Sequence, residues 1–240
     1  MRVSAFELST IYATAFKMFG MPAGMANDAA SIVATASLCG VAGLETTQRF
    51  LERYEGVSLK HELVVHKTPK GTFYISAGGA SLLTAGAAVL DLACTETDGC
   101  ALIIGDLSDT LVAPGLSRLV RERGIDAFVE WRCANELHCL SVLDEVEIAQ
   151  APVKPHGCLL AETQMRINLH VHARKERETN LCFRNAAFTA VNQLEAQSIR
   201  DGAEVESDGW AQVVALADTM LVPESEQSRA GGAGIGADGD

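Results

Sequence analysis

The stretch Ser76–Trp131, SAGGASLLTAGAAVLDLACTETDGCALIIGDLSDTLVAPGLSRLVRERGIDAFVEW, decides the fold of this chain. It begins with an Ala- and Leu-rich segment that predicts a helix. The apolar run ALIIGD at 101–106 predicts a buried strand, LSRLVRERG predicts a helix that ends at Gly124, and IDAFVEW predicts another strand. With the strand TFYIS at 72–76 just before it, the order strand, helix, strand, helix, strand is typical of a parallel sheet covered by helices, with right-handed crossovers.

The residues before this stretch predict three helices. Ser4 to Glu7 fits a capping box, and apolar residues recur at helical spacing up to Gly20. A second helix begins at Pro22 and runs towards Gly40, and a third covers about 44–54. In the third helix we expect Arg49 and Arg53 to face solvent, opposite its apolar side.

After Trp131 the pattern favours antiparallel strands. In MRINLHVHARK, Met165, Ile167, Leu169 and Val171 alternate with polar residues, which predicts a strand that includes His170 and His172 on its polar face. The segment 185–202 fits either a helix or an irregular excursion, and Asp208 is expected to cap a last helix. We therefore predict a mixed α/β protein with a helical unit at 1–58, a mixed α/β core at 59–222 and a Gly-rich tail at 223–240.

Composition excludes several classes of function. The formal net charge of −12 disfavours nucleic acid and anionic membranes as partners. The N-terminal residues lack the features of a signal peptide, and the apolar runs are too short to span a membrane, so a cytoplasmic protein is expected. The seven cysteines include no C-x-x-C pair and are expected to be buried, reduced thiols.

The Gly-rich tail carries the motif GIGADG at 234–239, which has the spacing of a dinucleotide-binding loop. Such a loop needs a following helix to hold the pyrophosphate, and one residue follows Gly239, so we do not expect a Rossmann loop. Ser225, Ser228 and Arg229 lie beside these glycines and form either an anion-binding nest or a solvated terminus.

The loop after the strand at 101–106 is the best candidate for a ligand site. In open parallel sheets ligands bind beyond the carboxyl ends of the strands, and this loop carries Asp106, Ser108, Asp109 and Thr110. Capping and turn formation by the same residues is the alternative. Two further groups contain potential metal ligands, His170 with His172, and Cys133 with His138 and Cys139, but neither has the spacing or charge of a metal site, and no metal is expected.

Two longer stretches carry a resemblance to known families. The N-terminal helices and the stretch Ser76–Trp131 resemble the malate/L-lactate dehydrogenase family, which includes sulfolactate and ureidoglycolate dehydrogenases. The ending VPESEQSRAGGAGIGADGD resembles that of an uncharacterised bacterial family of unknown function with the pattern VPxSExSRxxGAGxG. The resemblance implies a malate/L-lactate dehydrogenase-like fold that tends to form homodimers.

The departures from the dehydrogenases bear on function. Those enzymes carry a Ser-His-Gly motif after the Ala-rich helix, whose His takes part in acid/base chemistry, and a second His in the loop near the substrate. The corresponding stretches here, GVAGLETTQRF and GDLSDTLVAPG, have no His, and the position of the first holds Leu44 or Glu45, depending on the alignment. The chain is also shorter than those enzymes, so part of their nicotinamide-binding portion is expected to be missing.

These observations predict a protein that binds a small anionic metabolite without a cofactor, NAD(P) being disfavoured. Arg49, whose guanidinium suits a carboxylate, is expected to bind the ligand together with the loop and tail residues: Asp106, Ser108, Asp109, Thr110, Ser225, Ser228 and Arg229. One alternative is an enzyme on a 2-oxo or 2-hydroxy acid with Glu45, Asp106 or His170 as proton carrier. The other is a structural subunit of a complex.

Overall fold

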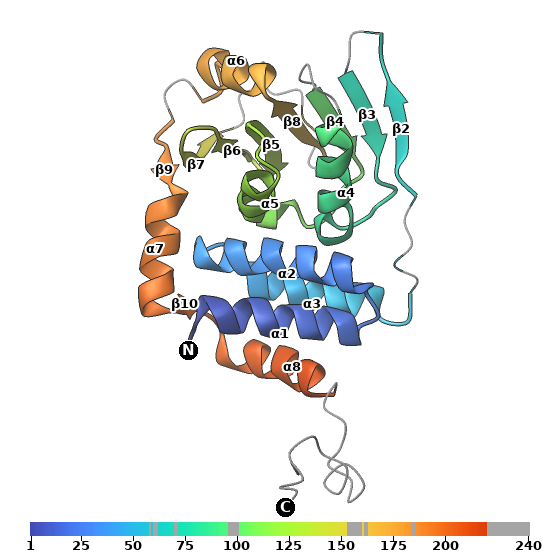
Figure 1. Ribbon diagram of the computed structural model, residues 1–240, viewed down its shortest axis with the longest axis vertical. Helices are drawn as coiled ribbons and strands as arrows, with labels where there is room; N and C mark the ends of the chain where they lie inside the picture. Colours follow the sequence, from blue (N-terminus) through green and yellow to red (C-terminus); the bar gives the residue numbers. More distant parts are fainter. Residues whose placement is uncertain are drawn as a thin grey trace, which may run out of the picture.

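The computed structural model describes residues 1–57, 59, 62–69, 72–95, 101–152, 160, 163–183 and 186–219. A helical layer lies across one end of a mixed sheet of eight strands (Figure 1). The helices are α1 (Ala5–Met18), α2 (Ala23–Leu38), α3 (Gly43–Tyr54), α4 (Leu82–Cys94), α5 (Leu116–Glu122), α6 (Val171–Thr179), α7 (Val191–Asp201) and α8 (Ser207–Asp218), with the 3₁₀ helix η1 at Thr110–Gly115. This arrangement confirms the predicted mixed α/β fold class.

The eight-stranded sheet has the order β2-β3-β4-β8-β5-β6-β7-β9. Its strands are β2 (Val64–Lys67), β3 (Thr72–Ser76), β4 (Ala101–Gly105), β5 (Ala127–Cys133), β6 (Glu136–Val142), β7 (Val146–Pro152), β8 (Met165–Leu169) and β9 (Thr189–Ala190). A small second sheet pairs β1 (Arg2–Val3) with β10 (Ala203–Glu204), which brings the start of the chain to the segment before α8.

The predicted parallel unit is only partly present. Strands β3 and β4 are parallel neighbours joined through α4, as expected. Strand β8 lies between β4 and β5 and is antiparallel to both, so β4 and β5 run in the same direction without pairing. The prediction failed at this point because β8 comes from a distant part of the chain, and local periodicity does not show which strands pair.

Two predicted boundaries also differ from the structure, and one segment that the sequence left open is assigned. The strand at 165–172 ends at Leu169, and His170, with a φ of 52°, turns the chain into α6. The undecided segment forms β9 and α7. The last helix is capped by Glu206, whose carboxylate accepts hydrogen bonds from the amides of Asp208 and Gly209, so Asp208 lies inside the helix.

The core has a large and a small part, one on each face of the sheet. The large part lies between the sheet and the helices α1 to α5, where the side chains of Phe16, Ile32 and Leu102 are fully buried. The smaller part contains Phe128 and Ala173 and is covered by α6. Helix α8 packs on α1, where Trp210 meets the ring of Tyr12 edge-on at 5.4 Å.

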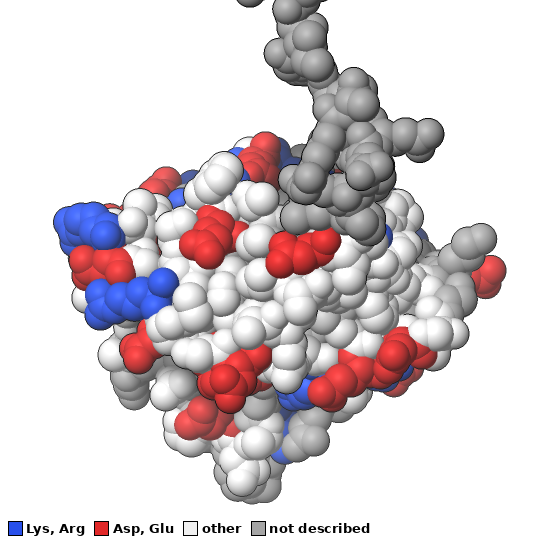
Figure 2. All heavy atoms as spheres, turned by 90° about the horizontal axis from the view of Figure 1, so that it is seen from below, with Lys and Arg blue, Asp and Glu red and all other residues white. Residues whose placement is uncertain are grey.

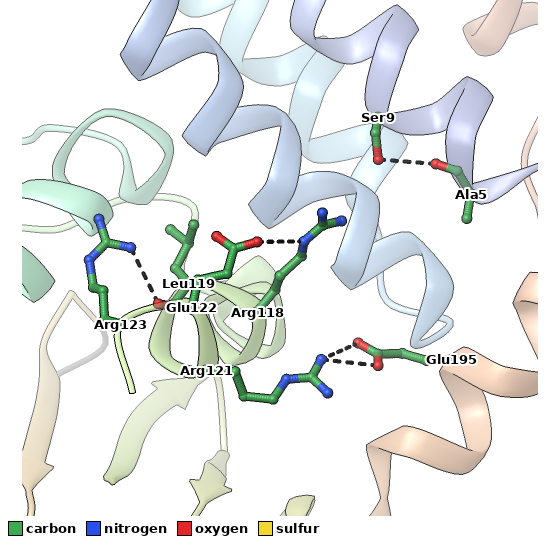
Figure 3. Close-up of polar contacts among 8 residues, drawn as sticks. All are labelled: Ala5, Ser9, Arg118, Leu119, Arg121, Glu122, Arg123 and Glu195. Carbon is green, nitrogen blue, oxygen red and sulfur yellow. Dashed lines mark hydrogen bonds and ion pairs between the residues drawn. The ribbon is translucent and has the colours of Figure 1, made fainter. Parts of the chain in front are cut away.

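Helix α7 contacts both α5 and the end of α2. Figure 3 shows Arg121 of α5 reaching Glu195 of α7, with an ion pair of 3.1 Å. Ser198 of α7 also donates a hydrogen bond of 2.8 Å to the carbonyl of Leu38 at the end of α2. Through these contacts α7 connects the end of α2 to α5.

The helical face of the molecule is acidic. Figure 2 shows carboxylates scattered over this face, with basic side chains towards its edges. Within the described ranges, no helix is long and apolar enough to cross a membrane.

Candidate functional site

The loops that follow β3 and β4 lie side by side. The amide of Gly79 donates to the carbonyl of Asp106 at 2.8 Å, and the amide of Ser108 donates to the carbonyl of Ala80 at 2.9 Å. Ser81 and Ser108 form a parallel bridge. The carboxyl ends of the two parallel strands therefore meet in one place, as the sequence indicated.

The four predicted residues of the second loop differ in exposure. Asp106 is exposed, whereas Thr110 is 9% exposed at the start of η1. Both Asp106 and Asp109 have left-handed backbones, with φ of 55° and 59°. The hydroxyl of Ser108 lies 3.2 Å from the carbonyl of Ala80 and 3.3 Å from Oδ2 of Asp109, so it serves the loop itself.

Arg49 is exposed on α3, and its Nη2 donates to Oγ1 of Thr46 at 3.2 Å. One turn further along, Arg53 donates from Nη2 to the carbonyl of Gly79 at 3.3 Å, and the hydroxyl of Tyr54 reaches the same oxygen at 3.2 Å. The contact between α3 and the loops is thus made by Arg53 and Tyr54. The sequence pattern identified Arg53 only as a solvent-facing residue.

The remaining predicted residues are placed elsewhere or not described. Ser225, Ser228 and Arg229, with the motif at 234–239, lie outside the described residues. His170 follows β8, whose end pairs with the beginning of β4, so it lies at the opposite end of the sheet from Asp106. His172 is in α6, so the two histidines do not share the face of a strand.

A cavity of about 640 Å³ opens between the helical layer and the sheet, and we call it the His138 cavity. Its walls come from the turn between α2 and α3, from η1, from strands β5 to β7 and from the segment leading into β9. The lining residues are Val41, Leu111, Pro114, Trp131, His138, Cys139, Ile148, Ala149, Gln150, Ala187 and Thr189.

His138 is the titratable imidazole of this cavity. Its ring stacks on Trp131 with centroids 5.5 Å apart and an interplanar angle of 14°, because the two residues face each other across β5 and β6. Burial lowers the pKa of His138 below its usual range, against a smaller opposing effect of Glu136, whose Oε2 lies 3.7 Å from Nε2. The ring is therefore neutral near pH 7 and is available to accept a proton.

Sequence reasoning considered His138 only as a metal ligand with Cys133 and Cys139. On β6, the ring of His138 faces the cavity, whereas Cys139, although it also lines the cavity, is part of the smaller core. The alternation of residues in ELHCLSV indicates that His138 and Cys139 face opposite sides of a strand. It does not show that His138 stacks on Trp131, because Trp131 lies on another strand. Among the described residues, no group of three or more His, Cys, Asp or Glu side chains is placed to hold a metal ion.

The cysteines are less uniform than expected. Cys39 and Cys139 are buried, and burial raises the pKa of each thiol to about 12. Cys94 is exposed, so the prediction of burial is wrong for that residue, and Cys133 and Cys182 are half-buried. Cys94 is the last residue of α4 and is not among the buried residues of that helix. Cys100 and Cys158 lie outside the described residues.

Three comparisons with known proteins bear on the fold. Residues 3–81 match the family model "Protein of unknown function (DUF3726)", and no curated protein matches the sequence. Malate dehydrogenase from Entamoeba histolytica superposes with a TM-score of 0.67 and 10% identity, over 93% of this chain and 99% of that one. Malate dehydrogenase from Pyrococcus horikoshii superposes with a TM-score of 0.63 and 11% identity, over 94% of this chain and 97% of that one. Sulfolactate dehydrogenase from Methanocaldococcus jannaschii superposes with a TM-score of 0.57 and 10% identity, over 92% of this chain and 97% of that one.

The chain has a malate dehydrogenase-like fold. The superpositions extend over nearly the full length of the solved chains, so the similarity is not confined to one part of them. Two stretches compared above with the dehydrogenases, GVAGLETTQRF and GDLSDTLVAPG, each contribute to the wall of the His138 cavity, although Leu44 and Glu45 are not among its lining residues. Val41 lies in the first segment, and Leu111 and Pro114 lie in the second.

Proposed function

We propose that this protein binds a small organic acid in the His138 cavity. One observation carries the proposal. Val41 of the first stretch without a His and Leu111 and Pro114 of the second line a single cavity, and His138 brings an imidazole to it from β6. The malate dehydrogenase-like fold supports the substrate class, since the similar enzymes are named for malate and sulfolactate, which are 2-hydroxy acids.

The lining predicts how such a ligand binds. Among the described residues that line the cavity there is no Arg or Lys, so the charge of a carboxylate is balanced by protonation of His138. A nearby carboxylate favours the charged imidazole and raises the pKa of His138. Binding therefore takes up a proton. The affinity falls as pH rises above the pKa of His138 in the unliganded protein, by at most about tenfold per pH unit.

The test is calorimetric titration of lactate and malate at several pH values between about 6 and 8, where an unperturbed imidazole titrates. Lactamide, which has the same shape without the charge, is the matched ligand. We expect lactate to bind more weakly as pH rises and lactamide to bind equally throughout. His138→Gln should abolish the pH dependence, whereas His172→Gln, at an exposed position of α6, should retain it. A pH dependence that persists in His138→Gln would overturn the proposal.

An oxidoreductase acting on a 2-hydroxy or 2-oxo acid is the second candidate, favoured by the neutral state of His138, which suits a proton acceptor. A nicotinamide cofactor would supply the hydride acceptor for that reaction. The described residues lining the cavity include no Arg, Lys or glycine-rich turn to hold a pyrophosphate, so they do not fit a dinucleotide. Reduction of NAD⁺ in the presence of malate, lost in His138→Gln, would decide for the enzyme.

A further inference from the structure

A second hollow lies on the opposite face of the sheet, and we call it the Arg166 groove. It encloses about 480 Å³ and is lined by residues of β2, β3, β4 and β8, with Leu160 and Gln164 from the segment before β8. Strand register explains how it forms. His66 faces Tyr74, Tyr74 faces Ile103, and Ile103 faces Arg166, so four side chains form one row across four neighbouring strands. Neighbouring side chains in such a row lie about 5 Å apart.

Glycine deepens this groove at the end of β4. Gly105 faces Ser76 across the β3–β4 pair and lines the groove. A Cβ added at Gly105 would meet no atom of the described residues within 4 Å, so no described side chain fills the space above its backbone. A ligand can therefore lie on the floor of the groove between Ser76 and Arg166.

The groove is rich in hydrogen-bond donors. Its lining offers the guanidinium of Arg166, the hydroxyls of Tyr74 and Ser76, and the imidazole of His66, and no Asp or Glu is among its described lining residues. This is a distinctive local composition in a chain with a formal net charge of −12. The ring of Tyr74, which is 48% exposed, and the side chain of Ile103 add an apolar surface to the same row.

The guanidinium of Arg166 is held in place by the buried carboxylate of Glu130. Its Nη1 lies 3.5 Å from Oε2 of Glu130, a residue that is 2% exposed. The other carboxylate oxygen of Glu130 accepts a hydrogen bond of 2.8 Å from Nδ2 of Asn180. Because Glu130 fixes one edge of the guanidinium, Arg166 loses little rotamer freedom when it binds a ligand. Its side chain remains 26% exposed, so donors are left for a ligand.

We propose that the Arg166 groove binds a small organic carboxylate with a flat apolar body. The carboxylate pairs with the guanidinium of Arg166, and the body rests on Tyr74 and Ile103. This site lies on the other face of the sheet from the His138 cavity and does not depend on it. Its cation is a fixed guanidinium, whereas that of the His138 cavity is created by protonation.

Benzoate is the probe for this site, with benzamide as the uncharged ligand of the same shape and inorganic phosphate as an anion without an apolar body. Binding is followed by ligand-observed NMR titration of the full chain. We expect benzoate to bind more tightly than either benzamide or phosphate. Equal binding of benzamide would overturn the role of Arg166, and equal binding of phosphate would overturn the role of Tyr74 and Ile103.

The variants separate binding from folding. Arg166→Gln leaves Glu130 buried without its cation and can unfold the protein, so the double variant with Glu130→Gln, which removes both charges, is compared as well. We expect the double variant to weaken benzoate by on the order of tenfold or more while circular dichroism shows an intact fold. Tyr74→Ala, at a half-exposed site, should also weaken benzoate.

A control variant should bind benzoate as the wild type does. Arg132→Gln removes a guanidinium from the end of β5, where it donates to the carbonyl of Ala134. His138→Gln alters the other proposed acid site, so the benzoate binding that remains in this variant belongs to the Arg166 groove. Loss of benzoate binding in His138→Gln with retention in the double variant would assign the carboxylate to the His138 cavity and overturn the present proposal.

Discussion

The contact between η1 and α2 gives the sharpest prediction of this structure. Gly115, the last residue of η1, lies directly on the backbone of α2 at Ile32. A Cβ placed at Gly115 would stand 2.6 Å from the carbonyl carbon and 2.8 Å from Cα of Ile32, and closer still to its carbonyl oxygen. These atoms belong to the middle of a buried helix, so they cannot move aside as the end of a side chain does.

Gly115→Ala should therefore force η1 and α2 apart. Overpacking against side chains costs about 1 to 3 kcal/mol. Since the clash here is with backbone, we expect a loss of about 3 kcal/mol in the free energy of unfolding, at the upper end of that range. For a chain of this size the loss corresponds to a fall in melting temperature of roughly 6 to 12 °C.

Urea unfolding followed by circular dichroism measures the loss, with two glycines as controls. Gly24→Ala in α2 meets no atom within 4 Å and should leave stability unchanged or raise it by up to about 1 kcal/mol, because Ala favours the helix. Gly86→Ala in α4 meets only the ends of leucine and isoleucine side chains, at 3.2 to 3.4 Å, and should lie between the two. Gly115→Ala with a stability within about 1 kcal/mol of the wild type would refute the reasoning.

Three further predictions concern charge, thiols and packing. Burial raises the pKa of Glu130, so the stability contributed by its protonated form is lost as pH rises through that pKa. In urea unfolding between about pH 4 and 7, the free energy of unfolding of Glu130→Gln should therefore rise relative to that of the wild type as pH increases. A difference that stays constant with pH would contradict this. In native protein a thiol reagent should modify Cys94 rapidly and Cys39 and Cys139 only after unfolding, so Cys94→Ser should remove one equivalent of rapidly reacting thiol. Trp210→Ala, at a side chain 3% exposed between α8 and α1, should lower the free energy of unfolding by about 3 to 5 kcal/mol, and a loss below about 1 kcal/mol would show that α8 packs independently of it.

Local signals predicted the elements of the first half of the chain well. Ser4 caps α1 by accepting a hydrogen bond from the amide of Glu7, as the capping box indicated. The helices and strands from 5 to 133 appear close to their expected places, because caps, glycines and apolar periodicity act within a few residues. The three-part division of the chain at 58 and 222 stays a prediction, and in the structure α8 packs on α1.

The candidate site was predicted only in part for the same physical reason. The loop at Asp106–Thr110 could be recognised because it directly follows a strand, and the structure places it beside the loop after β3. The role of Arg53 depends on a carbonyl 26 residues away, and the stacking of His138 depends on the register of β5 with β6. No pattern along the chain contains either distance.

The sequence by itself determined the fold class, the positions of most helices and strands and the acidic surface, because each of these depends on composition or on neighbours within a few residues. Only the tertiary structure decided that β8 lies between β4 and β5, since strand pairing is a choice among distant segments. That choice places Arg166 in one row with His66 and Tyr74 on one face of the sheet. The pairing of β5 with β6 places His138 on Trp131 on the other. Both proposed sites are therefore products of strand register.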